Sequence, residues 1–103
     1  MADRLESLKQ LVSEYPNDAF ARYGLALEYA NSGQTETALQ EFAKLLEQHP
    51  EYTAGYQMAA QTLLREGRND QARQLLQEGI ACARRSRNSH AENEMQQMLD
   101  ELN

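Results

Sequence analysis

The sequence predicts an all-α solenoid of about six antiparallel helices. Two apolar faces at helical spacing flank Gly33 within residues 19–50, which describes a helix, a short turn and a second helix folded back on the first. The pattern returns 34 residues later, where Pro16 is matched by Pro50 and Gly33 by Gly67. Such a period is typical of helical repeats. The composition agrees, because Ala, Leu, Gln, Glu and Arg dominate whereas Ile and Val are rare.

Length and charge restrict the classes of protein to consider. A chain of 103 residues predicts a single domain over residues 1–103. Its net charge of −6 disfavours general binding to nucleic acids or anionic membranes, since an acidic surface repels phosphates. The start, Met1-Ala2-Asp3-Arg4, lacks the apolar run of a signal peptide, and no run of apolar residues is long enough to span a bilayer. We therefore expect a cytoplasmic protein.

The first expected helix, residues 3–15, resembles the second half of a repeat. Its apolar residues follow a spacing of three and four, and a shift of 34 positions aligns Leu5, Leu8 and Leu11 with Leu39, Phe42 and Leu45. The remaining apolar residues of this face are Val12 and Tyr15. Residues 3–15 are therefore predicted to be a half repeat, ended by Pro16.

Two complete repeats are expected to follow, over residues 17–50 and 51–84. In the first, Asn17-Asp18 offers an N-cap to a helix reaching Asn31, Gly33 provides the turn, and a helix over residues 35–48 ends before Pro50. In the second, a helix over residues 51–65 ends at Gly67, and Asn69-Asp70 is predicted to cap the next helix. Gly79 lies inside that helix at the position of Leu45, which predicts close approach of a neighbouring helix.

The last expected helix, residues 88–102, is predicted to cover the end of the stack. Ser89-x-x-Glu92 has the pattern of a capping box. A one-residue insertion near residues 86–88 is inferred, because it turns the apolar residues inward and His90, Asn93 and Glu94 outward. The apolar side of the helix consists of Ala91, Met95, Met98, Leu99 and Leu102.

At these residues the sequence resembles the tetratricopeptide repeat family. The first copy matches the family pattern with Leu25-Ala26, Tyr29, Gly33, Ala38, Phe42, Leu45 and Pro50. In the second copy the same positions hold Ala59-Ala60, Leu63, Gly67, Ala72, Leu76, Gly79 and Arg84, with Leu63 and Leu76 in place of aromatic residues. Arg22 departs from the pattern, since the family has a large apolar residue there, and Arg84 replaces the proline.

The resemblance implies a right-handed superhelix whose concave groove is lined by the first helix of each pair and binds a peptide or helix of a partner protein. The groove residues that it implies in this chain are Phe20, Tyr23, Leu27, Asn31, Gln57, Gln61 and Arg65, together with Ala54 and, from the last helix, Glu92 and Gln96. The places where some members hold a terminal carboxylate are here occupied by Tyr23, Leu27, Gln57 and Gln61, so that specificity is not expected.

Three features of the sequence allow two explanations each. The stripe of Phe20, Tyr23 and Leu27 is either a contact surface for a peptide or is buried under the first helix. His90 and Glu94 have a spacing that could share a metal ion, although a solvated pair is preferred. Five arginines near helix ends could bind an anion, although neutralisation of helix dipoles and nearby acids is preferred. They are Arg65, Arg68, Arg84, Arg85 and Arg87.

No motif in the sequence indicates catalysis, a cofactor or a metal site. Cys82 has no second cysteine to pair with and is expected to be a small buried thiol. The sequence thus predicts a non-catalytic protein-interaction module, in which Phe20 and Tyr23 act as apolar anchors. The alternatives are a self-assembly module that forms a weak homodimer, or a repeat segment of a larger protein.

Overall fold

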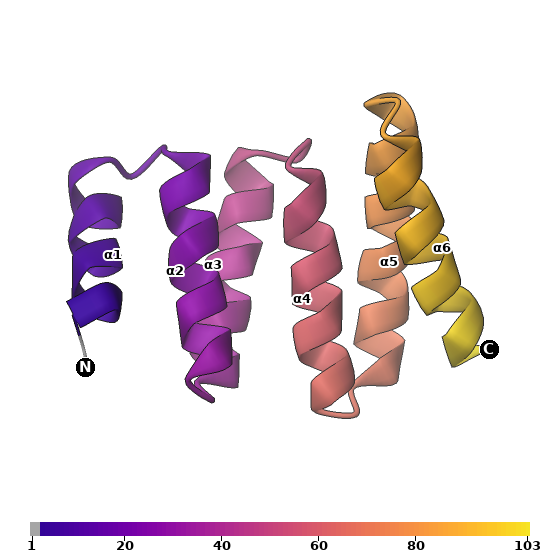
Figure 1. Cartoon of the computed structure of the whole chain (residues 1–103), viewed down its shortest axis with the longest axis horizontal. Helices are drawn as coiled ribbons and strands as arrows, with labels where there is room; N and C mark the ends of the chain where they lie inside the picture. The colour runs from indigo at the N-terminus through magenta and orange to yellow at the C-terminus, as the bar shows by residue number, and fades with distance from the viewer. Residues whose placement is uncertain (1–2) are drawn as a thin grey trace. The chain divides into compact units, whose positions relative to one another are not determined.

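The computed structural model describes residues 3–103, with side chains from Arg4 onward; Met1 and Ala2, at which the expected N-terminus begins, lie outside this range. Over these residues the chain is all-α, as predicted (Figure 1). The six helices are α1 (Asp3–Glu14), α2 (Ala19–Asn31), α3 (Thr35–Gln48), α4 (Thr53–Arg65), α5 (Asn69–Arg85) and α6 (Ser89–Leu102). The chain divides between His49 and Pro50 into two compact units, of which one contains α1 to α3 and the other α4 to α6. That these units make one domain stays a prediction.

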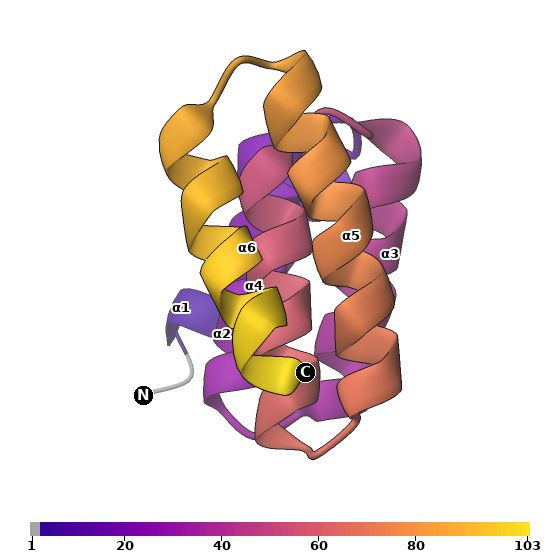
Figure 2. The same ribbon diagram turned by 90° about the vertical axis from the view of Figure 1, so that its right-hand side faces the viewer.

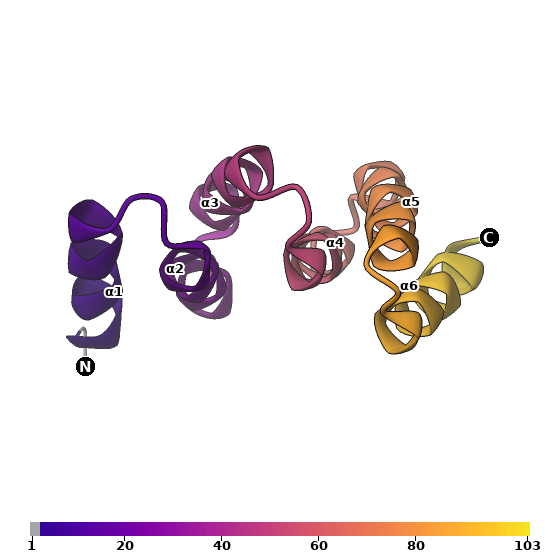
Figure 3. The same cartoon turned by 90° about the horizontal axis from the view of Figure 1, so that it is seen from above.

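In the first unit, α2 packs against α1 and against α3, with which it forms an antiparallel pair (Figure 3). The core of the pair consists of the residues that carry the repeat pattern, Leu25, Ala26, Tyr29, Ala38, Phe42 and Leu45, all of them buried. The predicted cap of α2 is confirmed, because Asp18 Oδ1 accepts a hydrogen bond of 3.1 Å from the amide of Ala21. The first helix is less buried than its pattern suggests, since Leu11 and Tyr15 are exposed.

Arg22, which departs from the repeat pattern, is buried and makes two polar contacts. Its Nη1 donates to Glu41 Oε1 at 2.6 Å and its Nη2 donates to the carbonyl of Pro16 at 3.1 Å. At the matching place in the second repeat, the hydroxyl of Tyr56 donates to the carbonyl of Pro50 at 2.8 Å. Two different side chains therefore tie the first helix of each repeat to the proline turn before it.

In the second unit, α5 packs against both α4 and α6, and Figure 2 shows α5 and α6 side by side. The core contains the residues expected from the pattern, Tyr56, Ala59, Ala60, Leu63, Ala72, Leu76, Ile80 and Ala83, together with Cys82. From α6, Ala91 and Met95 are buried, whereas His90, Asn93 and Glu94 are exposed, as inferred. The close approach expected at Gly79 is confirmed, since an added Cβ would lie 2.7 Å from Cβ of Tyr56.

The expected starts of α4 and α5 are wrong by one or two residues. Helix α4 begins at Thr53 rather than at residue 51, because Pro50 and Glu51 belong to the preceding turn. Helix α5 is capped by Arg68 rather than by Asn69-Asp70, and Asp70 instead pairs with Arg73 at 2.8 Å. Because Arg68 takes the N-cap position, Asn69 and Asp70 lie inside the first turn of α5.

The capping box at Ser89 and Glu92 is also wrong. Asn88 caps α6 instead, because its Oδ1 accepts a hydrogen bond of 3.1 Å from the amide of Ala91. The carboxylate of Glu92 is unable to reach back to the cap, since it binds Arg84 Nε at 2.6 Å.

The link between α5 and α6 repeats the turn found inside each helix pair. Arg87 has a φ of +56°, close to the values of +81° at Gly33 and +72° at Gly67. In all three turns the next amide bonds back to the fifth residue before it, for example from Asn88 to the carbonyl of Ala83 at 2.8 Å. Helix α6 begins 36 residues after the start of α4, whereas α4 begins 34 residues after the start of α2. The interval is therefore longer than the repeat period, as the inferred insertion requires.

The buried pair of Arg22 and Glu41 provides a stability test. Their side chains are 9% and 13% exposed, so Glu41→Ala leaves an uncompensated buried charge and is expected to lower the free energy of unfolding by about 3 kcal/mol. The double variant Arg22→Tyr/Glu41→Leu imports the residues found 34 positions later, Tyr56 and Leu75. It should stay within about 1 kcal/mol of the parent in urea denaturation. A double variant as unstable as Glu41→Ala would contradict this explanation.

Gly79 and Gly24 form a matched pair for testing helix contacts. An added Cβ at Gly79 would lie 2.5 Å from Met95 Sδ, so Gly79→Ala is expected to cost about 1–3 kcal/mol despite the better helix propensity of alanine. At Gly24 the nearest atom is Leu8 Cδ2 at 3.2 Å, the end of a flexible side chain. Gly24→Ala should therefore leave stability unchanged or raise it by up to about 1 kcal/mol. Thermal unfolding followed by circular dichroism compares the two variants, and equal losses would be inconsistent with the packing.

Candidate functional site

The residues expected on the outer face of α2 lie along one side of that helix. Phe20 is 74% exposed, which is the largest exposure among the large apolar side chains that the structure describes. Asn31 is also exposed, whereas Tyr23 and Leu27 are half-buried. Burial of the whole stripe under α1 is therefore wrong, although Leu8 of α1 approaches the same helix face at Gly24. An exposed aromatic ring followed by two partly exposed apolar side chains has the composition of a surface that could contact a partner.

Burial has a measurable effect on Tyr23. Loss of solvent around its ring raises the pKa of the phenol above its ordinary value of 10.0. Tyr23 is therefore neutral at physiological pH. Its ring provides apolar area while its hydroxyl remains a hydrogen-bonding group, a combination that is common in protein interfaces.

On α4, Gln57, Gln61 and Arg65 follow one another at intervals of four residues and share one face. Gln61 and Arg65 are exposed and Gln57 is half-buried. The side-chain amide of Gln57 donates to Glu94 Oε1 of α6 at 3.4 Å, so this face continues onto α6. The arrangement offers amide donors and acceptors, one guanidinium group and one carboxylate.

The structure places Glu94 beside α4, whereas Glu92 and Gln96 had been expected there. Glu92 instead binds Arg84 of α5, and Gln96 donates to Asp100 within α6 at 2.9 Å. The signal that could have located Glu94 is Asn88, because reading it as the N-cap fixes the register of α6.

The seven expected groove residues thus form two sets, one on α2 in the first unit and one on α4 in the second. Within each set the side chains lie along one helix face. That the two sets line one concave groove stays a prediction.

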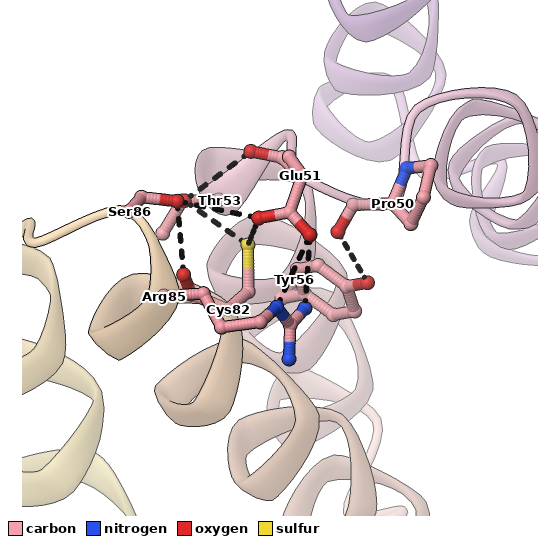
Figure 4. A network of polar contacts seen from close by, with 7 residues as sticks. All are labelled: Pro50, Glu51, Thr53, Tyr56, Cys82, Arg85 and Ser86. Carbon is pink, nitrogen blue, oxygen red and sulfur yellow. Dashed lines mark hydrogen bonds and ion pairs between the residues drawn. The ribbon is translucent and has the colours of Figure 1, made fainter.

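A second cluster of polar side chains joins the start of α4 to the end of α5 (Figure 4). The carboxylate of Glu51 binds Arg85 at 3.1 Å and accepts hydrogen bonds from Ser86 Oγ at 3.4 Å and Cys82 Sγ at 3.8 Å. Thr53 Oγ1 lies 3.3 Å from the same sulfur. Cys82 is fully buried, as predicted, which argues against a reactive thiol. This cluster therefore holds two helix ends together.

For the arginines near helix ends and for the pair of His90 and Glu94, the structure favours the simpler of the two explanations. Arg84 and Arg85 are paired with Glu92 and Glu51, so neither guanidinium is free for an external anion. His90 and Glu94 form an exposed pair at 3.5 Å. Among the described residues, no three potential metal ligands gather, and no helix is long and apolar enough to cross a membrane.

Comparison with known proteins reveals one family. The tetratricopeptide repeat family matches residues 29–92. A TPR repeat-containing protein of Pseudomonas aeruginosa is 30% identical over 98 residues, which are 95% of this chain and 93% of that protein.

Solved structures agree with this match. The solution structure of a tetratricopeptide repeat domain protein from Salinibacter ruber has a TM-score of 0.80 at 30% identity, covering 84% of this chain and 88% of that one. A protein of Bordetella parapertussis has a TM-score of 0.82 at 26% identity, covering 95% of this chain and 85% of that one. The fold is therefore an all-α solenoid of the tetratricopeptide type.

The hydroxyl of Tyr56 gives a test that depends on pH. Burial, followed by the nearby charges of Cys82 and Glu78, raises the pKa of Tyr56 above 10.0. The unfolded chain then loses this phenol proton at lower pH than the folded chain, so stability is full below about pH 10 and falls as the pH rises further. Tyr56→Phe should cost about 1 kcal/mol at pH 7, through the lost bond to Pro50, and should weaken the alkaline fall.

Urea denaturation at several pH values measures both effects. Tyr15→Phe, at an exposed tyrosine, is the control and should change stability at pH 7 by less than about 0.5 kcal/mol. An alkaline fall that is as steep in Tyr56→Phe as in the parent would assign it to other groups.

Proposed function

The chain belongs to the tetratricopeptide repeat family, and on that premise we propose that it is a non-catalytic module that binds a segment of a partner protein through the outer faces of α2 and α4. Domains of this family are generally protein-interaction modules and generally lack catalytic activity. In this proposal the chain acts by binding its partner and catalyses no reaction. A cytoplasmic location, expected from the sequence, is part of the proposal.

The exposure of Phe20 carries this proposal. A phenyl ring that is 74% exposed adds nothing to the core, whereas it can bury most of its area against a partner. Tyr23 and Leu27 extend the apolar surface along the same face of α2. Rigid aromatic side chains dominate the binding energy of protein interfaces, so Phe20 and Tyr23 are proposed as anchors for apolar side chains of the partner.

The face of α4 supplies the polar part of the recognition. Gln57 and Gln61 each offer an amide that donates and accepts, which suits the alternating N–H and C=O groups of an extended backbone. Arg65 in the last turn of α4 is exposed and is proposed to bind a carboxylate or carbonyl of the partner.

The proposal is tested with peptides selected against the full chain from a random displayed library, whose affinities are then measured by calorimetry. Phe20→Ala and Gln61→Ala should each weaken a selected peptide at least fivefold, about 1 kcal/mol, because each removes a contact to the partner. Both side chains are exposed, so the melting temperature should stay nearly constant.

Gln40→Ala, an exposed position on α3, is the matched control and should leave the affinity unchanged. Peptides whose binding is insensitive to Phe20→Ala and to Gln61→Ala would overturn the proposed surface. A loss of stability equal to the loss of affinity would assign these residues to the fold instead.

A further inference from the structure

The turn between α1 and α2 carries two exposed aromatic rings and two exposed carboxylates. Tyr15 is 58% and Phe20 is 74% exposed, and Glu14 and Asp18 are exposed as well. The amide of Asp18 bonds to the carbonyl of Tyr15 at 3.0 Å, which closes the turn directly before α2 begins. These four residues, called here the aromatic–acidic turn, therefore lie together at one end of the first unit.

The carboxylates of this turn are not neutralised by the cations of their own unit. Residues 4–49 contain seven acidic but only four basic side chains. The four basic side chains all pair with other carboxylates, Arg4 with Glu28, Lys9 with Glu6, and Arg22 and Lys44 with Glu41. Within the part of the chain that the structure describes, Glu14 and Asp18 are hydrogen-bonded only to uncharged groups.

These local contacts leave most of the negative charge in place. Glu14 accepts a hydrogen bond of 3.0 Å from the neutral amide of Gln10. Asp18 caps α2 through Oδ1, and the N-terminal dipole of that helix offsets only about half of one charge. The last turn of α1 contains no basic residue, whereas α5 ends with Arg84 and Arg85. The negative end of the α1 dipole therefore adds to the potential of the two carboxylates.

A guanidinium or ammonium group suits both parts of the turn. The faces of aromatic rings attract cations, and carboxylates bind them through charge-assisted hydrogen bonds. Arginine combines the two, because its planar group can stack on a ring and donate two N–H groups to one carboxylate. An acidic segment would instead be repelled by the same carboxylates. Charge complementarity therefore favours a basic partner at this end of α2.

We propose that the aromatic–acidic turn binds an arginine or lysine side chain of the partner, so that the segment bound by α2 is basic as well as apolar. This role depends on the proposed function, because Phe20 belongs to both surfaces. Apolar side chains of the segment contact Phe20 and Tyr23, and its cation lies over the turn. Because the carboxylates are exposed, the attraction adds modestly to affinity and more strongly to the choice of partner.

Peptides selected against the full chain from a random displayed library, and kept only if Phe20→Ala weakens their binding, provide the first test. They are expected to carry arginine or lysine beside an apolar residue. Replacing that basic residue by glutamine should lower the affinity about threefold in calorimetry. Raising NaCl from about 50 mM to about 500 mM should also weaken binding.

The sequences of the peptides separate this inference from the proposed function. Peptides that depend on Phe20 but carry no basic residue would overturn the basic partner and leave the proposed function standing. A library in which no peptide depends on Phe20 would overturn the basic partner together with the apolar anchor on which it rests.

Variants of the chain test the two carboxylates. Glu14→Gln/Asp18→Asn removes both charges and keeps the cap of α2, since asparagine caps helices as well as aspartate. It should weaken a selected peptide about fivefold. Glu78→Gln is the matched control, because Glu78 is also exposed and also bonds to the glutamine four residues before it, at 3.1 Å. It should leave the affinity unchanged, and equal losses would reduce the effect to net charge and overturn the site.

A thermodynamic cycle connects the peptide with the turn. When the basic residue of the peptide is already replaced by glutamine, Glu14→Gln/Asp18→Asn should cause little further loss, because both changes remove the same contact. Losses that add would contradict binding of the cation at this turn. Melting temperatures from circular dichroism check that each variant is folded.

Discussion

Close approach of paired helices at small residues is the constraint on which both units depend. Ala26 and Ala38 in the first unit, and Ala60 and Ala72 in the second, are completely buried. With a methyl group at these places, the larger side chains beside them, such as Phe42 and Leu76, can fill the space between the helices. Gly79 extends the same principle to α6, where even a methyl group would collide with Met95 and Tyr56.

This packing determines which surfaces remain for binding. Each first helix uses one side for its partner helix, so its outer side is free to vary without cost to the core. On α2 that side carries Phe20, whereas the matching position on α4 is Ala54. The two repeats therefore share a core but differ in surface chemistry, aromatic on α2 and amide-rich on α4. Differences of this kind allow one scaffold to hold different partners.

The sequence was sufficient for the number and type of helices, because Gly33, Gly67 and the proline at the repeat boundary occur at a constant interval and mark the turns. The caps were harder to predict. Asn69 and Asn88 are both followed by a residue that also favours caps, and choosing between neighbours needs the hydrogen bonds of the turn. The role of Arg22 was also beyond the pattern, since its partner Glu41 lies 19 residues further along the chain, in the next helix. On the site, periodicity indicated which residues share a helix face, but not that Phe20 is open while Tyr23 is half-buried.

The glycine-type turn at Arg87 has a consequence for the series of repeats. The longer interval before α6 allows Ala91 and Met95 to face inward, where both are buried and Met95 lies against Gly79 of α5. Next to them, Glu92 and Gln96 are partly exposed and bind Arg84 and Asp100. A carboxylate and an amide there would repel a further apolar helix. The polar side chains beside the buried face of α6 therefore suit contact with water better than contact with another helix.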